Sequence, residues 1–178
     1  MIFFVIMLFG CKSDIKNIQI YGEIDTLPEM IAKDIEFIRS DSGFVQALLT
    51  SPLMKKYSGK KPYVEFPDGF KVQFFDSLLN VKSVITAKYG INHEQKKRME
   101  AFKDVVVINN ERNETLNTEH LIWDKSKKKI FSDVAIKITT KDEVIYGEGL
   151  ESDETFSKYE ILKPTGVLKL KEEDNDGE

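Results

Sequence analysis

Short runs of alternating apolar and polar residues, each ended by a polar turn, recur along most of the chain. The clearest unit is Leu116–Asp133, in which two runs rich in Leu, Ile, Thr, Trp and Phe flank a loop of Asp, Ser and Lys. This arrangement is typical of a β-hairpin. Because an isolated hairpin is only marginally stable in water, this one must be paired with and covered by others.

Similar units of strand, polar loop and strand are expected on both sides of it, over residues 44–57, 84–100 and 144–161. In the first of these, Ser51-Pro52 is interpreted as the turn of a hairpin. Recurrence of one such unit implies that neighbouring units stack to bury a face that none could bury alone.

Two glycines mark further turns. Asp41-Ser42-Gly43 predicts a tight turn that closes the first hairpin, since Gly43 tolerates a positive φ. Pro67-Asp68-Gly69 predicts a second turn, which joins Tyr63–Phe66 to Phe70–Phe75. No segment shows a sustained helical period.

The predicted class is therefore all-β, a meander of short antiparallel strands joined by hairpins. Periodicity alone does not choose between a closed barrel and an open jellyroll. Strands that are apolar on both faces, such as 105–108 and 144–146, favour the open form, with an interior that something else occupies. A plain sandwich core is the alternative explanation of the same strands.

Composition agrees with one modest domain. The chain has 178 residues, of which 41% are hydrophobic, enough for a real core. Its 26 Lys and Arg against 30 Asp and Glu give a net charge of −4, which argues against nucleic acid as a partner. The single cysteine, Cys11, excludes an intrachain disulfide and a cysteine-based zinc cluster.

The N-terminal residues predict attachment to a membrane. Ile2–Phe9 is an apolar run too short to cross a bilayer as a helix, and it matches the hydrophobic region of a secretory signal. Leu8-Phe9-Gly10-Cys11 resembles a bacterial lipobox, in which the cysteine is lipidated, although Phe9 is bulkier than the small residue usual there. An uncleaved signal anchor with a buried Cys11 is the alternative. Both interpretations place the remaining chain outside the cytoplasm.

The chain is thus divided into four parts by composition. They are a signal peptide ending in a lipobox at 1–11, a linker at 12–30, a β-jellyroll domain at 31–170 and an acidic disordered tail at 171–178.

Enzymatic chemistry has little support. The two histidines, His93 and His120, have no motif around them, and neither His-Glu-x-x-His nor Cys-x-x-Cys spacing occurs. No glycine-rich phosphate loop opens a helix. We therefore expect no catalytic residue, no bound metal and no cofactor.

Four features together resemble the LptC family. They are the membrane-anchored start, the early Ser42-Gly43 turn and the repeating unit typified by Leu116–Asp124, followed late in the chain by Val144–Leu150 with its Gly-x-Gly-Leu close. The resemblance covers roughly residues 31 to 168. Familiar members have a transmembrane helix where this chain has a short apolar run ending in Cys11.

The resemblance implies a V-shaped β-jellyroll, open along one side, whose apolar interior receives the acyl chains of lipopolysaccharide. It further implies an inner-membrane ABC export complex as the partner at the N-terminal edge. A soluble LptA-like periplasmic jellyroll protein is the partner at the C-terminal edge, joined by edge-strand pairing. The expected location is the periplasmic face of the inner membrane.

Alternation along the strands then selects the residues expected to contact acyl chains. They are Phe37, Val45, Ala47, Val72, Phe74, Ile85, Val107, Leu121, Trp123, Ile136, Ile138 and Ile145. Gly43 and Gly149 resemble family glycines at turns and at the C-terminal close, where they serve a turn or the docking of a partner.

Two other classes of protein stay open. A structural or interaction β-lipoprotein of the cell envelope would share the anchor and the hairpins but hold no ligand. A lipid-modifying enzyme would need a polar group inside the apolar groove, and His120 is its candidate.

Overall fold

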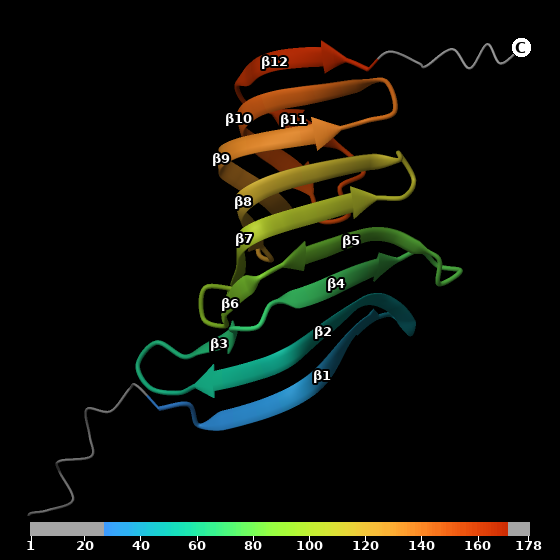
Figure 1. Cartoon of the computed structure of the whole chain (residues 1–178). Coiled ribbons are helices and arrows are strands. Elements are labelled where there is room, and N and C mark those ends of the chain that lie inside the picture. The colour runs from blue at the N-terminus through green and yellow to red at the C-terminus, as the bar shows by residue number, and fades with distance from the viewer. Residues whose placement is uncertain (1–26, 171–178) are drawn as a thin grey trace, which may run out of the picture.

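The computed structural model describes residues 27–170, and the regular elements in that part of the chain are β-strands (Figure 1). In chain order these are β1 (Met30–Asp41), β2 (Phe44–Tyr57), β3 (Tyr63–Phe66), β4 (Phe70–Phe75), β5 (Val81–Ala87), β6 (Tyr89–His93), β7 (Arg98–Asn109), β8 (Glu114–Asp124), β9 (Lys129–Thr139), β10 (Glu143–Asp153), β11 (Tyr159–Ile161) and β12 (Pro164–Lys169). Within residues 27–170 the strands pair antiparallel and form one 12-stranded sheet. The predicted all-β class is confirmed.

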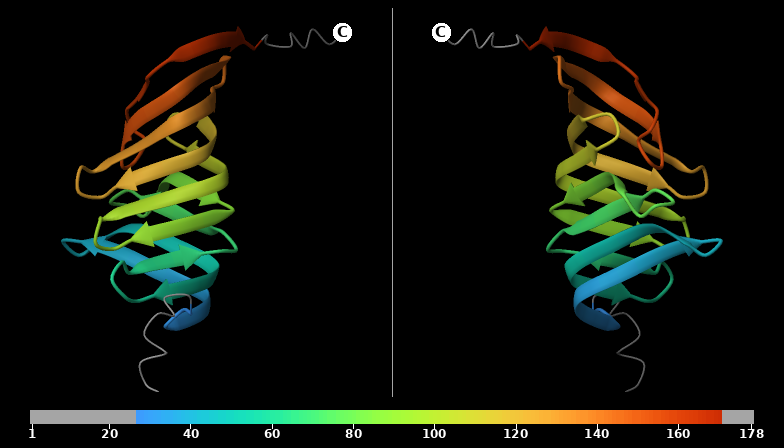
Figure 2. Two further views of the ribbon diagram at one scale, coloured as in Figure 1. Left: turned by 90° about the vertical axis from the view of Figure 1, so that its left-hand side faces the viewer. Right: turned by 90° about the vertical axis from the view of Figure 1, so that its right-hand side faces the viewer.

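The sheet is folded into two layers that share their long strands (Figure 2). Strands β1, β2, β7, β8, β9 and β10 contribute to both layers. In one layer β4 and β5 lie between β2 and β7, and β12 pairs with β10. In the other, β3 and β6 lie between β2 and β7, and β11 pairs with β10. We name them the β4–β5 layer and the β3–β6 layer.

Irregularities in the long strands mark the bend between the layers. The register shifts in β7 between Phe102 and Val105, where Lys103 and Asp104 have φ values of 64° and 47°. The register shifts again in β10 beside Gly149, whose φ is 85°. A bulge adds a residue to one strand and sharpens its local twist, so these positions allow one strand to serve two layers.

Strand β2 bends at Pro52 instead. It pairs with β4 up to Thr50 and with β3 from Lys55 onward. Proline has no N–H to donate, which suits the unpaired stretch between the two partners. The buried Ser51 hydroxyl lies 2.6 Å from the carbonyl oxygen of Gly69 and 2.9 Å from that of Leu53, so it can donate to either across the gap.

The hydrophobic core lies between the layers. Val105, Ile130 and Leu150 have no solvent exposure, and the Phe74 ring meets the Trp123 ring edge-on at 5.9 Å. Phe74 belongs to the β4–β5 layer and Trp123 to the part of β8 in the β3–β6 layer. The core therefore joins the layers directly.

Several predicted hairpins are confirmed. Leu116–Asp133 contains β8, its turn and the start of β9, the 42–43 turn joins β1 to β2, and 144–161 contains β10 and β11. One prediction is wrong: 44–57 is the single strand β2, because Ser51-Pro52 bends the chain without reversing it. In 84–100 only Tyr89 onward forms the hairpin, since residues up to Ala87 belong to β5. Strands such as β2, with 14 residues, are also longer than expected.

The predictions for residues 1–11, with the lipidation of Cys11, and for the tail at 171–178 lie outside the described residues, as does the linker up to residue 26. Over residues 27–170 there is no helix long and apolar enough to span a membrane.

Candidate functional site

One row of apolar side chains crosses the whole β4–β5 layer in register, with one residue from each strand. We call it the apolar row: Phe37, Leu49, Val72, Ile85, Val107, Leu116, Ile138, Ile145 and Val167. Residues paired across antiparallel strands point to the same face, so these side chains form a continuous apolar strip along the stacking direction of the sheet.

Exposure along the apolar row is lowest in its middle. Val107 and Ile138 are each 2% exposed, whereas the end members, Phe37 and Val167, are 50% and 53% exposed. Phe37 is on β1 and Val167 on β12, the edge strands of this layer. The strip therefore runs through the interior and reaches the surface at both ends of the sheet.

The β3–β6 layer supplies the facing wall. Its apolar residues in the core cluster are Met54, Val64, Phe66, Met99, Ala101, Leu121, Ile130 and Leu150. They alternate with outward-facing polar residues along their strands, as the burial pattern of β3 illustrates.

Between the walls, near the N-terminal edge, lies a cavity of about 330 Å³. The residues around it are Phe37, Ile38, Arg39, Ala47, Leu49, Met54, Val64, Phe66, Val72, Asn92, Glu94, Met99, Trp123 and Lys125. Most are apolar, and the charged ones come from the ends of strands. A mainly apolar cavity with a few polar groups is the usual form of a site that binds a small molecule.

Trp123 is the centre of the polar part of this cavity. Its indole Nε1 donates to Glu154 Oε1 at 2.8 Å. The guanidinium of Arg39 lies 5.4 Å from the ring centre and the ammonium of Lys125 lies 5.3 Å from it, both within cation–π range. The Lys125 ammonium also donates to Asn92 Oδ1 at 2.8 Å. Burial, and then the nearby Arg39 cation, lower the pKa of Lys125.

The C-terminal half of the interior is filled. Phe156, in the β10–β11 loop, is 3% exposed and has a φ of 57°. Its carbonyl oxygen accepts a buried hydrogen bond of 2.7 Å from Asn109 Nδ2, at the end of β7 in the opposite layer. The hollow that remains there measures about 20 Å³. The loop thus closes the space between the layers at this end.

Further contacts hold the same loop closed. Its own fold depends on Asp153, whose carboxylate accepts from the amides of Thr155 and Ser157 at 3.1 and 2.9 Å. Arg112 lies over the Tyr159 ring at 5.1 Å. Burial, followed by a hydrogen bond to Glu114, raises the pKa of Tyr159 to about 12.

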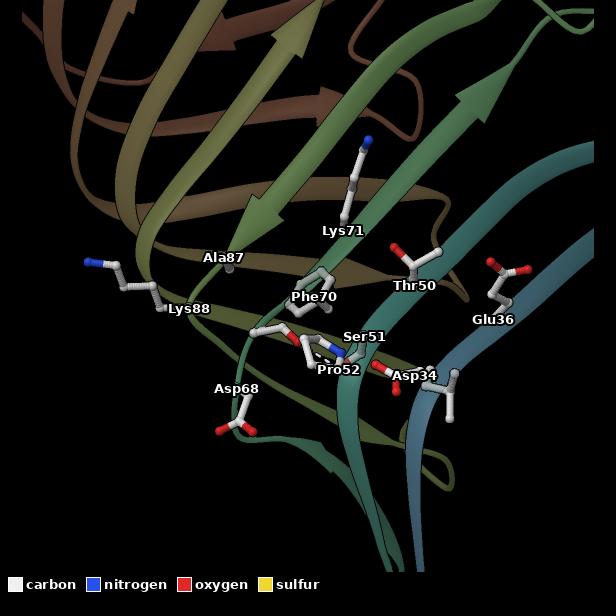
Figure 3. Close-up of a pocket in the computed structure, with 12 residues that line it drawn as sticks. Asp34, Glu36, Thr50, Ser51, Pro52, Asp68, Phe70, Lys71, Ala87 and Lys88 are labelled. Carbon is white, nitrogen blue, oxygen red and sulfur yellow. Dashed lines mark hydrogen bonds between the residues drawn. The ribbon is translucent and has the colours of Figure 1, made fainter.

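A larger hollow of about 500 Å³ lies on the outside of the bend, away from the apolar row (Figure 3). Its rim carries charges of both signs, including Asp34, Glu36 and Lys71. It forms where β2 leaves β4 for β3, which is the gap bridged by Ser51. We therefore interpret this hollow as a consequence of the change of partner in β2 and not as a binding site.

His120 lies outside the interior. Its ring stacks on Phe102 at 4.4 Å, and its nitrogens are 3.2 Å from Glu100 Oε2 and 3.3 Å from Asp133 Oδ1. The next residue, Leu121, points into the core, so His120 points outward. No group of three or more His, Cys, Asp or Glu side chains within residues 27–170 is arranged to hold a metal ion.

Most residues selected by alternation are inside the fold. Ala47, Val72, Phe74, Ile85, Val107, Leu121, Ile136 and Ile138 are buried in the core, and Trp123 and Ile145 pack against it. Val45 is half-buried near the first turn, and Phe37 is exposed at the cavity. Gly43 is in the β1–β2 turn with φ 84°, and Gly149 is at the bulge within β10.

Sequence reasoning missed other interior residues. Interpreting 44–57 as two strands does not select Met54 as an inward-facing residue. Leu116 and Leu49 show the alternation that their neighbours show, and that signal could have found them. Arg39 and Lys125 are charged and carried no apolar signal. Phe156 sits in a polar loop, where no periodicity applies.

Comparison with known proteins gives one family. The family model described as "Lipopolysaccharide-assembly, LptC-related" matches residues 1–166. No curated protein matches the chain.

Proposed function

This chain belongs to the LptC family, which has a role in lipopolysaccharide export, and from this membership we propose that it carries lipopolysaccharide between its two β-layers to the next protein of the export machinery. The family is a transport component associated with the periplasmic face of the inner membrane. The proposed role needs no catalysis, since a protein that transfers a lipid must only shelter its acyl chains from water.

The observation that carries this proposal is the apolar row. A continuous apolar strip from Phe37 to Val167 offers acyl chains a path through the sheet from one edge strand to the other. Each methylene group buried along such a path gains about 0.8 kcal/mol. Because the row is apolar throughout, an acyl chain can move along it without breaking hydrogen bonds made by the side chains of the row.

The proposed direction of transfer runs from the β1 end of the apolar row to the β12 end. The cavity near β1 would receive lipopolysaccharide from an inner-membrane ABC transporter, which supplies the energy. The exposed edge of β12 would pair with an LptA-like jellyroll protein and continue the sheet into it. An anchor at Cys11, or an uncleaved signal anchor, would hold the protein at the membrane.

Passage to β12 requires the β10–β11 loop to move. Phe156 fills the space between the layers at that end, and its contact with Asn109 crosses from one layer to the other. Displacing the loop would connect the cavity to the C-terminal end of the apolar row. We therefore interpret residues 153–158 as a gate in the proposed path.

Photocrosslinking in cells tests the proposal. A crosslinking amino acid is placed singly at Leu49 and Ile145, which are half-buried members of the apolar row. The neighbouring Thr50 and Tyr146 point to the outer face of the same strands and are the matched controls. We expect adducts with lipopolysaccharide at Leu49 and Ile145 alone.

Other outcomes would contradict the proposal. Equal adducts at all four positions would mean contact without a defined path. Adducts at none would favour a structural β-lipoprotein of the cell envelope that holds no ligand.

A further inference from the structure

Two cations from different layers line the N-terminal cavity. Arg39 is on β1 of the β4–β5 layer, and Lys125 directly follows β8 in the β3–β6 layer. Both line the cavity and both lie over the Trp123 ring. The fold thus places two positive charges around one ring at the rim of an apolar space, close enough for Arg39 to lower the pKa of Lys125.

The Lys125 ammonium has little compensation for its charge. It donates a hydrogen bond to the neutral amide of Asn92, and within the described part of the chain no carboxylate oxygen lies within 4 Å of it. Burial and the field of Arg39 lower its pKa, and the more distant carboxylates of Glu94 and Glu154 oppose that effect. A partly buried ammonium in this position gains strongly from an anion.

Arg39 is also only partly paired. Its guanidinium is 3.7 Å from Glu154 Oε2, and its side chain is 47% exposed. Glu154 is already bonded to the Trp123 indole through its other oxygen. The guanidinium therefore keeps donors that can reach a ligand at the cavity.

We propose that Arg39 and Lys125 bind the phosphate group of an amphiphile whose acyl chain lies in the cavity. The inference rests on the proposed function and names the chemical class of cargo that this entrance accepts, a phosphorylated lipid. Guanidinium and ammonium groups are the side chains that bind phosphate oxygens in proteins, by charge-assisted hydrogen bonds. A phosphate between the two would also relieve their mutual repulsion.

The chain itself provides the probe for this site. It has a single tryptophan, Trp123, so tryptophan fluorescence, excited where the six tyrosines do not absorb, reports on the cavity. The purified full chain is titrated with diphosphorylated lipid A, with the same lipid lacking both phosphates, and with inorganic phosphate. The variants are Lys125→Gln, Lys125→Arg and Arg39→Gln, with Lys127→Gln as the matched control, because Lys127 is in the same turn and its side chain is 73% exposed.

We expect Lys125→Gln and Arg39→Gln each to weaken binding of diphosphorylated lipid A by about 10-fold, the size of one charge-assisted hydrogen bond. Lys125→Arg and Lys127→Gln should bind it as the unchanged chain does. Affinity for the dephosphorylated lipid should be lower and should be the same in all variants. Inorganic phosphate should bind far more weakly than the lipid, since it cannot use the cavity.

Three results would overturn the inference. If Lys125→Gln binds both lipids as the unchanged chain does, the cations only support Trp123. If inorganic phosphate binds as tightly as the phosphorylated lipid, the site is for free phosphate and not for a lipid head group. If the unchanged chain binds neither lipid, the proposed function itself fails, and the failure is distinguishable from loss of phosphate selectivity alone.

Discussion

Trp123 is the residue at which the two layers are joined. It packs on Phe74 of the β4–β5 layer, and its indole N–H is bonded to Glu154, which follows β10. An aromatic ring with one polar atom suits this position, because the ring fills the apolar interior while the N–H finds a partner at the rim. The same residue therefore contributes to packing and to the proposed recognition of cargo.

Tyr159 predicts how stability changes at alkaline pH. Burial and then Glu114 raise its pKa from 10.0 to about 12, so the folded protein holds the phenolic proton more tightly than the unfolded chain does. The raised pKa of Tyr159 therefore adds to the unfolding free energy. This addition is fully present below the pKa of the unfolded chain and is lost as the pH rises through the pKa of the folded protein. We expect Tyr159→Phe to lose less stability than the unchanged chain between about pH 10 and about pH 12. Urea unfolding midpoints across that range measure the effect, and parallel profiles for the two proteins would contradict it.

At the scale of single residues, alternation predicts well which apolar residues are buried, but it does not predict where charged side chains lie. Val72 and Val107 could be selected because an apolar residue in a regular strand has only two faces to choose between. Lys125 could not, since its place beside Arg39 depends on how far the two layers close on each other. That distance is a property of the bend, which no local pattern encodes.

At the scale of elements, two of the glycines with a positive φ offer a matched comparison. Gly43 and Gly149 have φ values of 84° and 85°, so alanine strains the backbone equally at both, by about 1 to 2 kcal/mol. A Cβ at Gly43 would meet nothing within 4 Å, but at Gly149 it would lie 3.2 Å from both Ser132 O and Leu162 Cδ1. We expect Gly149→Ala to lower the unfolding free energy by at least about 1 kcal/mol more than Gly43→Ala does.

Chemical denaturation of the two variants measures this difference. Equal losses would show that β10 can shift to accept the side chain, and that the bend at its bulge is not tightly fixed. The result also bears on the proposed docking role of Gly149. A larger loss of stability in Gly149→Ala than in Gly43→Ala would mean that glycine is needed there for the bend in β10 and not for docking a partner.

The β10–β11 loop is expected to depend on one hydrogen bond between the layers. Asn109→Asp keeps the oxygen that accepts from the amides of Glu111 and Arg112 but removes the donor to Phe156 O. The negative charge would then face a carbonyl oxygen, so the loop should detach more often. We expect faster amide hydrogen exchange in residues 154–158 of this variant.

Asn110→Asp is the control for that experiment. Asn110 also donates to a backbone carbonyl, that of Val81, but this bond lies within the β4–β5 layer. Its loss should leave exchange in the loop unchanged. Similar acceleration in both variants would argue against a specific gate.

Turn chemistry predicted most reversals of the chain and missed its bends. Gly43 was found because a positive φ in a two-residue turn has a clear residue preference. Ser51-Pro52 carries the same kind of signal, yet β2 continues through it and only changes partner. The Pro67-Asp68-Gly69 turn likewise joins β3 to β4 without pairing them, and carries the chain from one layer to the other. Packing across the layers decides which partner a strand takes, and the local sequence does not contain this information.

At the scale of the whole molecule, the fold leaves a free strand at each end of one layer. Within residues 27–170, strand β1 pairs only with β2 and β12 pairs only with β10, so both edges of the β4–β5 layer have backbone groups without a partner in this part of the chain. Exposed edges of this kind attract other strands. Under the proposed transfer of lipid along the sheet, these two edges are where neighbouring proteins would extend it.

Proline substitutions in β12 test the free edge of this strand and its pairing with β10 separately. Successive N–H groups of a strand point to opposite sides, so Val167→Pro and Leu168→Pro remove donors from opposite edges. One of the two should weaken pull-down of an LptA-like jellyroll protein while leaving the melting temperature unchanged, because the lost donor faces outward. The other should lower the melting temperature, since it breaks a bond to β10. Unchanged pull-down by both variants would exclude β12 as the docking edge, and the exit of the apolar row at Val167 would then need a partner that binds without extending the sheet.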